Sequence, residues 1–420
     1  MFESFKLPAK TLTTLDYKHY LEDLMGFNNY LNELGISTKH TRIERYIYFY
    51  ETLIEKQDEF DPQTIFKNVK EFPGEHFEDW ALYILREANE LVWIYNSIKA
   101  GLKKKCRIVG LTSKLSEIVG GSDITALDQK THSRNIQFEL RIASYFMNAG
   151  YNIEFSELTD IIASRNRHTF YIECKRVENT SKITKRLGDA AKQLTKNSNI
   201  TKHKKKTYSI IAIDVTKVAY PHNGVSFGFT PEMTRDKIQE KLYSIMHSIN
   251  PNSFISDSTL MIWYQIHFPA FVLYPKPTNS TRISNGFQPN ERKFHLNSKP
   301  FKLIDALIRE ANKVDSRHTK SEKLRPKHKI ELPKGTVMWM DEDLLNEVMI
   351  DNIDFTRDQE EIVFHYIINE EKTEFPFIFV SMAINSIPEQ ELKEIRHDKG
   401  HIVARVAASL LLLSDPYEQG

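Results

Sequence analysis

Three charged residues in the middle of the sequence have the types and the spacing that phosphate chemistry requires. Asp160 begins one apolar run, and Glu173 and Lys175 lie near the end of the next. Between the two runs stands Arg165-Asn166-Arg167-His168, which is typical of a tight turn because asparagine tolerates a left-handed backbone. The pattern predicts a β-hairpin that carries two carboxylates and an ammonium group.

The register of this hairpin determines which side chains meet. A tight turn centred on residues 166–167 places Asp160 opposite Glu173. Directly opposed residues share a face of the sheet, with Cβ atoms ~4.5–5.5 Å apart. Lys175 lies two residues beyond Glu173 and points to the same face, whereas Cys174 points to the other.

Two opposed carboxylates repel each other unless a cation lies between them. Their hard oxygen atoms suit Mg²⁺ or Mn²⁺ better than zinc. Such an ion polarises a phosphate and lowers the pKa of a bound water, and a nearby ammonium group stabilises the negative charge that develops. We therefore expect metal-assisted phosphate chemistry at Asp160, Glu173 and Lys175.

The segments around these residues alternate between helical and strand periodicity. The resulting order is α-β-β-β-α-β. The sequence predicts a helix at 132–149, strands at 151–155, 160–164 and 169–177, a helix at 183–197 and a strand buried on both faces at 208–215.

The set Asp160…Glu173-Cys174-Lys175 resembles the motif of the PD-(D/E)XK nuclease superfamily, and the predicted order of elements is similar to that superfamily's core. The resemblance implies a restriction-endonuclease-like fold and a Mg²⁺- or Mn²⁺-dependent nuclease that acts on DNA. It implies catalytic roles for Asp160, Glu173 and Lys175.

The resemblance covers about residues 130–220 and extends to further positions. It implies that Glu139, on the preceding helix, completes the metal site together with the backbone carbonyl of Cys174. It also implies a catalytic role for Gln193 on the following helix. One position departs from the motif, because Thr159 stands where the family has proline.

A Glu-x-Lys tripeptide alone has little specificity, because it occurs three more times in this chain. None of these copies follows a strand and turn headed by an aspartate. The simplest alternative for Glu173 and Lys175 is an exposed ion pair on an edge strand. The further copies are Glu291/Lys293, Glu370/Lys372 and Glu391/Lys393.

Basic residues are concentrated next to the motif. From Arg165 to Lys206 there are thirteen Lys or Arg against three Asp or Glu, although the net charge of the whole chain is only +1. Such a surface favours contact with nucleic-acid phosphates. The alternative is an ordinary solvated helix. The candidate nucleic-acid-binding residues are Lys182, Lys185, Arg186 and Lys192.

The whole chain is expected to be of the mixed α/β (α+β) class and to have four parts. Amphipathic periodicity predicts helices at 17–34, 42–54 and 78–98, whereas an apolar run at 375–382 predicts a strand. The expected parts are a helical N-terminal module with a connector at 1–130, the nuclease core with its extension at 131–275, a basic loop or linker at 276–335, and a C-terminal α/β segment at 336–420.

The two cysteines, Cys106 and Cys174, exclude a disulfide framework and form no zinc-binding spacing. The first residues lack the apolar segment of a signal peptide, and no run of 18 apolar residues occurs. We therefore expect a protein of the reducing cytoplasm that does not enter a membrane.

Other functions and partners stay open. A catalytically inactive nucleic-acid-binding or scaffold protein of the same fold is one alternative, and an RNase is another. Cutting both strands of a duplex requires two active sites, which favours a homodimer. The chain lacks a GxxxxGK[ST] loop, so ATPase or recognition functions would come from partner proteins. A helical module joined to a nuclease core resembles bacterial defence or mobile-element systems, which is an analogy only.

Overall fold

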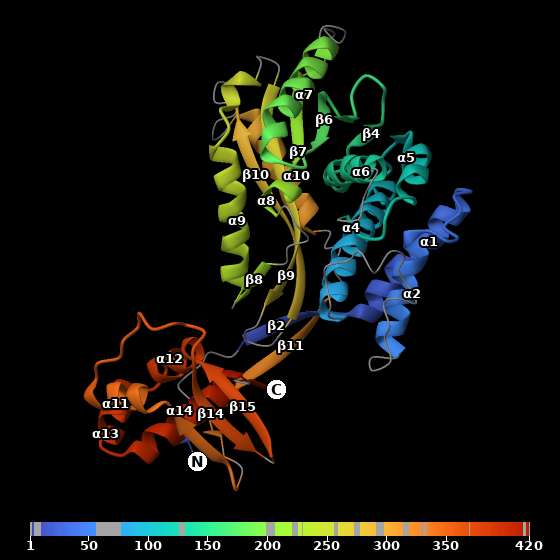
Figure 1. Ribbon diagram of the computed structural model, residues 1–420. Helices are drawn as coiled ribbons and strands as arrows, with labels where there is room; N and C mark the ends of the chain where they lie inside the picture. The colour runs from blue at the N-terminus through green and yellow to red at the C-terminus, as the bar shows by residue number, and fades with distance from the viewer. Residues whose placement is uncertain are drawn as a thin grey trace. The chain divides into compact units, whose positions relative to one another are not determined.

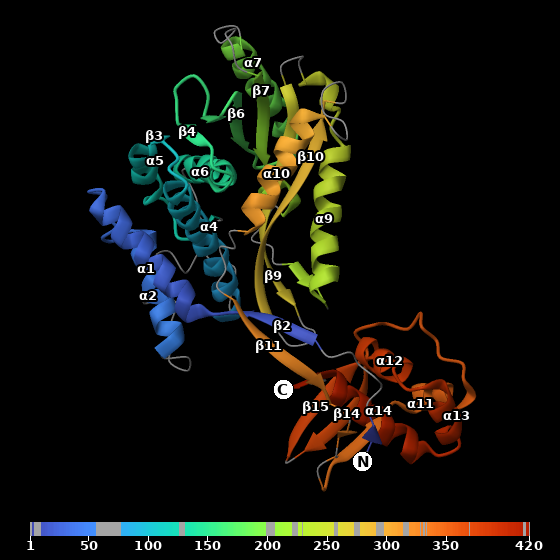
Figure 2. The ribbon, with the colours of Figure 1, turned by 180° about the vertical axis from the view of Figure 1, so that it is seen from behind.

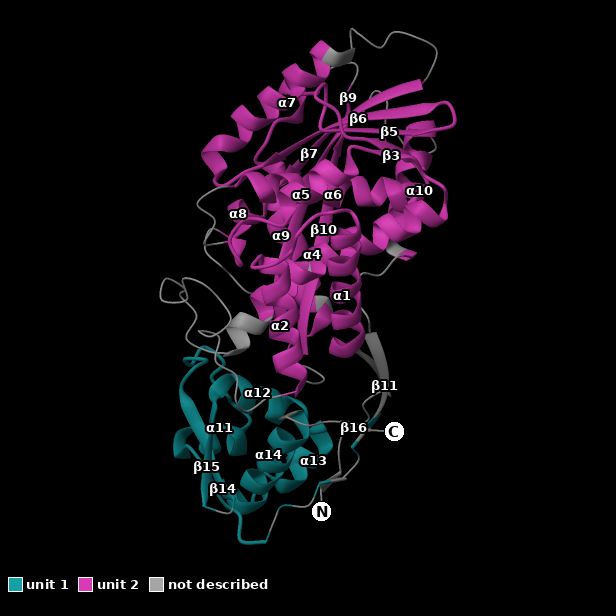
Figure 3. Cartoon of the chain, turned by 90° about the vertical axis from the view of Figure 1, so that its right-hand side faces the viewer, with its two compact units in different colours: residues 1–14, 320–420 teal, residues 15–319 magenta. Residues whose placement is uncertain are grey.

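A computed structural model shows two compact units (Figure 3). One comprises residues 15–319, and the other comprises residues 1–14 and 320–420. We describe each unit by itself. The described residues are 2–3, 10–55, 77–125, 131–198, 206–220, 226–228, 230–255, 259–272, 278–290, 298–313, 319–327, 329–330, 332, 334–368, 370–414 and 417–419.

The larger unit contains a mixed sheet of eight strands, so the expected α/β class is confirmed. The order is β10-β9-β7-β6-β5-β4-β3, with β8 paired to β9. β6, β7 and β9 run parallel, whereas β4, β5 and β6 are antiparallel neighbours. The strands are β3 (Ile108–Val109), β4 (Asn152–Glu154), β5 (Ile161–Arg165), β6 (His168–Arg176), β7 (Lys206–Asp214), β8 (Ser226–Gly228), β9 (Thr259–Val272) and β10 (Thr278–Pro289).

Helices cover both faces of this sheet (Figures 1 and 2). The elements α6, β4, β5, β6, α7 and β7 follow one another in the predicted order α-β-β-β-α-β. The helices are α1 (Tyr17–Glu33), α2 (Arg42–Glu55), α4 (Phe77–Lys103), α5 (Leu111–Ile118), α6 (His132–Asn148), α7 (Ile183–Ser198), α8 (Thr216–Ala219), α9 (Pro231–His247) and α10 (Lys299–Lys313).

β7 shows how the two faces are filled. Ile210 and Ala212 belong to the core that includes α4, α6 and α10. Ile211 and Ile213 belong to a second core, formed with α7 and α9 on the opposite face. Successive residues of a strand point to opposite faces, so a strand covered on both sides is apolar at nearly every position. The prediction of a strand buried on both faces is confirmed.

The N-terminal helices share their core with the sheet. Their predicted positions are confirmed by α1, α2 and α4. Buried residues of these helices, such as Tyr46 and Leu91, lie in the same continuous core as Phe146 of α6 and Trp263 of β9. α4 therefore contributes side chains directly to the interior beside the sheet.

Part of the segment expected to be a loop, 276–335, is regular structure. β10 pairs with β9 along its whole length, antiparallel from Thr278 to Pro289. β10 is too polar to be recognised as a strand from its periodicity, and several of its polar side chains make tertiary hydrogen bonds. Asn285 accepts hydrogen bonds from Trp263 and Gln265, at 2.8 Å each. α10 follows and packs against α6.

The smaller unit has a core of its own, formed by the antiparallel sheet β13-β14-β15 and the helices beside it. The strand expected at 375–382 is wrong, because β15 ends at Pro376 and α12 begins at Phe377. The unit also contains β1–β12 pairing and the sheet β16-β11-β2. Its elements are β1 (Phe2–Glu3), β2 (Lys10–Leu15), β11 (Thr319–Pro326), β12 (Lys329–Ile330), β13 (Val337–Met340), α11 (Glu342–Ile350), β14 (Ile362–Ile368), β15 (Glu371–Pro376), α12 (Phe377–Asn385), α13 (Glu389–Ile395), α14 (Lys399–Ser414) and β16 (Tyr417–Gln419).

None of the helices in the described ranges combines the length and the apolar character needed to cross a membrane.

Candidate active site

The hairpin that carries the motif forms in the predicted register. Ser164 pairs with Thr169 and Ile161 with Ile172, as a turn at residues 166–167 requires. Asn166 adopts a φ of +54°, a left-handed conformation that asparagine tolerates better than most residues. Asp160 directly precedes β5, one position beyond the last of these pairs.

Two hydrogen bonds fasten the residues before β5 to β6. The Cys174 N–H donates to Asp160 Oδ2 over 2.7 Å. The Thr159 hydroxyl, which is buried, donates to the carbonyl of Ile172 over 2.9 Å. Thr159 therefore has an anchoring role at the position where the sequence departs from the family motif, and sequence reasoning did not identify this role.

Lys175 lies between the two carboxylates of the hairpin. Its Nζ is 3.1 Å from Glu173 Oε2 and 3.8 Å from Asp160 Oδ2. Glu173 is only 1% exposed, and β6 is an interior strand between β5 and β7. The alternative of an exposed pair on an edge strand is therefore wrong.

Glu139 reaches the neighbourhood of Asp160 from α6. Its Oε2 pairs with Lys114 Nζ of α5 over 2.6 Å, and the Glu139 side chain is buried. Burial and then the charge of Asp160 raise the pKa of Glu139 to about 7, although Lys114 opposes the shift. Nothing in the sequence pattern identified Lys114, which is distant from Glu139 along the chain.

Glu173 has the same electrostatic character as Glu139. Burial and then the charge of Asp160 raise its pKa to about 7, against the opposing effect of Lys175. Burial alone would lower the pKa of Lys175, but the charges of Asp160 and Glu173 outweigh it and raise that pKa. The charge of Asp160 thus raises the pKa of both glutamates, and negative charge is in excess at this point.

The donor atoms fit a hard divalent cation, although the side chains are not gathered into a cage. Among the residues with described positions, no three His, Cys, Asp or Glu side chains stand close enough to hold a metal ion together. Lys175 and Lys114 instead pair with the carboxylates. In a β-strand, the N–H and the C=O of one residue point toward the same neighbouring strand. The Cys174 N–H donates to Asp160, so the Cys174 carbonyl also points toward the side of Asp160. The available ligands are oxygen atoms, which Mg²⁺ prefers.

The remaining predicted residues lie on or beside α7. Gln193 is exposed, and no hydrogen bond among the described residues joins it to the carboxylates. Lys182, just before α7, is exposed and pairs with Glu178 over 2.8 Å. The other basic candidates, Lys185, Arg186 and Lys192, are exposed on α7.

Comparison with known proteins adds no assignment to this geometry. The chain matched no protein-family model, no curated protein and no solved structure. What the cluster does must therefore be argued from its own residues.

Proposed function

We propose that the chain is a metal-dependent nuclease with a restriction-endonuclease-like core and that it hydrolyses phosphodiester bonds in DNA. The observation that carries the proposal is the arrangement of Lys175 3.1 Å from Glu173 and 3.8 Å from Asp160. Both carboxylates lie at the end of one hairpin in the α-β-β-β-α-β segment.

The raised pKa values of Glu139 and Glu173 support a cation-binding role. Buried carboxylates that repel one another store unfavourable electrostatic energy, and a divalent cation relieves it. Asp160, Glu173 and the Cys174 carbonyl would hold Mg²⁺ or Mn²⁺, with Glu139 completing the set after leaving Lys114. When bound there, the ion would polarise the scissile phosphate and lower the pKa of an attacking water.

Lys175 is the residue that we assign to charge stabilisation. With a metal ion bound to the carboxylates, the ammonium group of Lys175 would be free to turn toward the scissile phosphate and stabilise the negative charge that grows there. Lys185, Arg186 and Lys192 on α7 would contact flanking phosphates, because they are exposed and lie on the helix that follows β6 in the chain.

The setting of this activity is also part of the proposal. Both cysteines are free and buried, which favours a reducing compartment such as the cytoplasm. A homodimer would supply the two active sites that a double-strand cut requires. Partner proteins would supply any ATPase or recognition function. A role in bacterial defence or in a mobile element is proposed by analogy with systems that join a helical module to a nuclease core.

Cleavage assays with purified full-length protein test the proposal. We expect Mg²⁺ or Mn²⁺ to support cleavage of supercoiled DNA and EDTA to stop it. RNA of the same sequence is tested in parallel as the alternative substrate. Asp160→Asn should lower the cleavage rate by at least about 10²-fold, because it removes the charge of a proposed metal ligand. Asparagine keeps an oxygen that accepts the Cys174 N–H, so the fold should be preserved.

A matched control comes from another Glu-x-Lys copy in the chain. Glu370→Gln alters an exposed residue at the turn between β14 and β15 and should leave cleavage unchanged. Equal rates for the wild type and Asp160→Asn would refute the site. Nucleic-acid binding by the wild type without metal-dependent cleavage would favour the inactive scaffold, and preferential cleavage of RNA would favour an RNase.

A further inference from the structure

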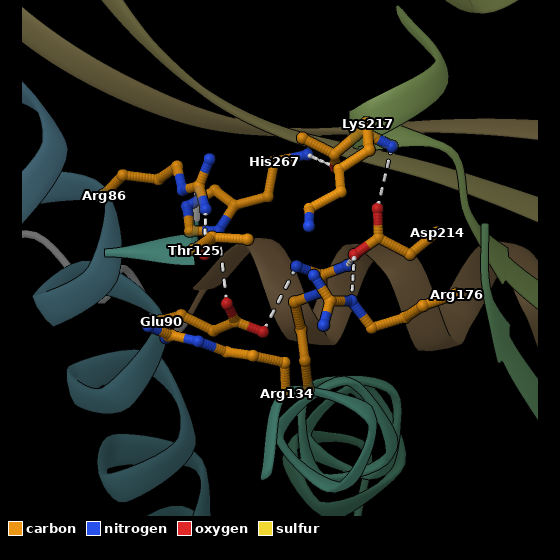
Figure 4. A pocket seen from close by; sticks show the side chains of 10 residues that line it. Arg86, Glu90, Thr125, Arg134, Arg176, Asp214, Lys217 and His267 are labelled. Atoms are coloured by element: carbon orange, nitrogen blue, oxygen red, sulfur yellow. Dashed lines mark hydrogen bonds and ion pairs between the residues drawn. The ribbon is translucent and has the colours of Figure 1, made fainter. Parts of the chain in front are cut away.

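A charged cavity lies where α4, α6, β6, β7 and β9 meet (Figure 4). Its volume is about 20 Å³. For comparison, a cavity needs ~10–15 Å³ to hold one water molecule. The cavity therefore admits one small polar group. Two carboxylates, Glu90 and Asp214, line it together with five cationic side chains, which are Arg86, Arg134, Arg141, Arg176 and Lys217.

Three of the arginines have carboxylate partners close by. Arg141 lies 2.8 Å from Asp214 and 3.1 Å from Glu90. Arg86 pairs over 2.7 Å with Glu87, a buried carboxylate outside the cavity lining, and Arg134 pairs with the same carboxylate. These ion pairs join α4, α6 and the sheet, so the three guanidinium groups have a structural role.

The positive charge of Arg176 is compensated much less well by nearby carboxylates. Its only ion pair with another described residue joins Nε to Asp214 Oδ2 over 3.6 Å, and its guanidinium makes no hydrogen bond within the described ranges. Burial lowers the pKa of Arg176. The charges of Asp214 and Glu90 oppose this effect, whereas those of the nearby Arg134 and Arg141 add to it. The side chain is 14% exposed, so the cavity is not sealed from solvent at this residue.

We propose that this cavity binds a single tetrahedral oxyanion of the phosphate type and that Arg176 is its principal ligand. Partly buried guanidinium groups that repel one another are stabilised when an anion lies between them. The planar fork of arginine matches two oxygen atoms of a phosphate. Because Arg176 is partly exposed, a phosphate group can reach its guanidinium from the solvent side, while any attached sugar and base stay outside the cavity.

This site is separate from the proposed nuclease centre. None of Asp160, Glu173, Lys175 and Glu139 lines the cavity. Arg176 follows Lys175 directly on β6, but adjacent strand residues point to opposite faces. The oxyanion site can therefore be tested without metal and without any cleavage reaction, and its failure would not bear on the nuclease.

Inorganic phosphate is the first probe, and thermal unfolding of the full-length protein in EDTA is the measurement. Phosphate should raise the melting temperature to a plateau, whereas sodium chloride at the same ionic strength should not. Arg176→Gln should weaken phosphate binding about tenfold or more, as expected for the loss of a charge-assisted fork. Lys182→Gln is the matched control, because this lysine is exposed and near β6 but does not line the cavity.

The phosphate response distinguishes a binding site from a purely structural cluster. If Arg176 only supported the fold, Arg176→Gln would lower the melting temperature and keep the wild-type response to phosphate. Because its charge is poorly compensated, we expect Arg176→Gln without phosphate to be at least as stable as the wild type. Should Arg176→Gln fail to fold, Arg176→Lys keeps the charge, removes the fork and should still weaken phosphate binding.

The source of the phosphate is the second readout. Binding is compared for a nucleoside 5′-monophosphate and for oligonucleotides with a 5′-phosphate or a 5′-hydroxyl end. A preference for the 5′-phosphate that disappears in Arg176→Gln identifies a nucleic-acid end, and binding of inorganic phosphate alone identifies the free ion. A wild type that phosphate stabilises no more than chloride, or an equal phosphate response in Arg176→Gln, overturns the proposal.

Discussion

Lys175 is the residue whose substitution best separates chemistry from binding. Its ammonium group contacts Glu173 and approaches Asp160. A contact that strengthens only in the transition state lowers turnover when it is removed and barely alters ground-state affinity. We predict that Lys175→Ala binds DNA as the wild type does and cleaves it ~10²–10³ times more slowly. Single-turnover cleavage in Mg²⁺, with DNA affinity measured in Ca²⁺, tests this.

Two further variants sharpen the Lys175 test. Lys175→Arg should not restore cleavage, because a planar guanidinium cannot replace a compact ammonium group. Lys372→Ala changes the lysine of another Glu-x-Lys copy, on β15, and should cleave normally. Loss of DNA binding in Lys175→Ala, with the cleavage rate preserved at saturating protein, would show that the lysine is only a phosphate anchor.

The titration of Glu173 predicts how metal-free stability depends on pH. Its pKa is raised to about 7 from the ordinary 4.5. A carboxyl group with a raised folded-state pKa contributes stability that is fully present below about pH 4.5 and is lost as pH rises through about 7. We predict that the free energy of unfolding of Glu173→Gln, relative to that of the wild type, rises by up to about 3 kcal/mol between pH 5 and pH 8. Urea unfolding in EDTA measures this difference.

The same titration opposes metal binding at low pH, because carboxylate ligands must lose their protons. The affinity of the wild type for Mg²⁺ should therefore fall as pH drops below about 7. A stability difference between Glu173→Gln and the wild type that stays constant from pH 5 to pH 8 would contradict the raised pKa.

At the scale of the element, α7 combines an apolar face with a basic one. Leu187, Ala190 and Leu194 are buried against the sheet, which leaves Lys185, Arg186 and Lys192 exposed. Each phosphate contact contributes about one unit to the slope of log affinity against log salt concentration. We predict that changing all three basic residues to Gln weakens DNA binding equally for all sequences and lowers this slope by up to about three units.

The neighbouring helix provides the control for α7. α9 covers the same face of the sheet, and Arg235 and Lys237 are exposed on it. Changing these two residues to Gln should leave the salt dependence of DNA binding unchanged. If the α7 variant kept the wild-type slope, its basic residues would be an ordinary solvated surface. Lys182 is left intact in this test because Glu178 already pairs with it.

At the scale of the whole molecule, the two units have separate hydrophobic cores. A unit with a hydrophobic core of its own can unfold independently of the rest of the chain. We predict two transitions on thermal or urea unfolding of the full-length chain. Leu344→Ala in the smaller unit should shift one transition and Leu91→Ala in the larger unit the other, each by ~2–5 kcal/mol, because both side chains are fully buried. A single transition that both variants shift alike would contradict this prediction.

Local chemistry in the sequence was sufficient for the order of elements and for the hairpin. The α-β-β-β-α-β order followed from periodicity, which depends only on neighbouring residues. The pairing of Ser164 with Thr169 followed from the turn at Asn166, because a tight turn fixes the register of both strands. Asp160, Glu173 and Lys175 could be placed together for the same reason.

Only the tertiary structure determined the contacts between residues far apart in the chain. The polar strand β10 is stabilised by hydrogen bonds such as Trp263 to Asn285, which no local pattern signals. Lys114 meets Glu139 because α5 packs on α6. The oxyanion cavity joins Arg86 of α4 to Arg176 of β6, and their proximity depends on how the helix packs on the sheet. Periodicity shows which face of an element is buried, whereas the partner that buries it is chosen by the packing of the whole unit.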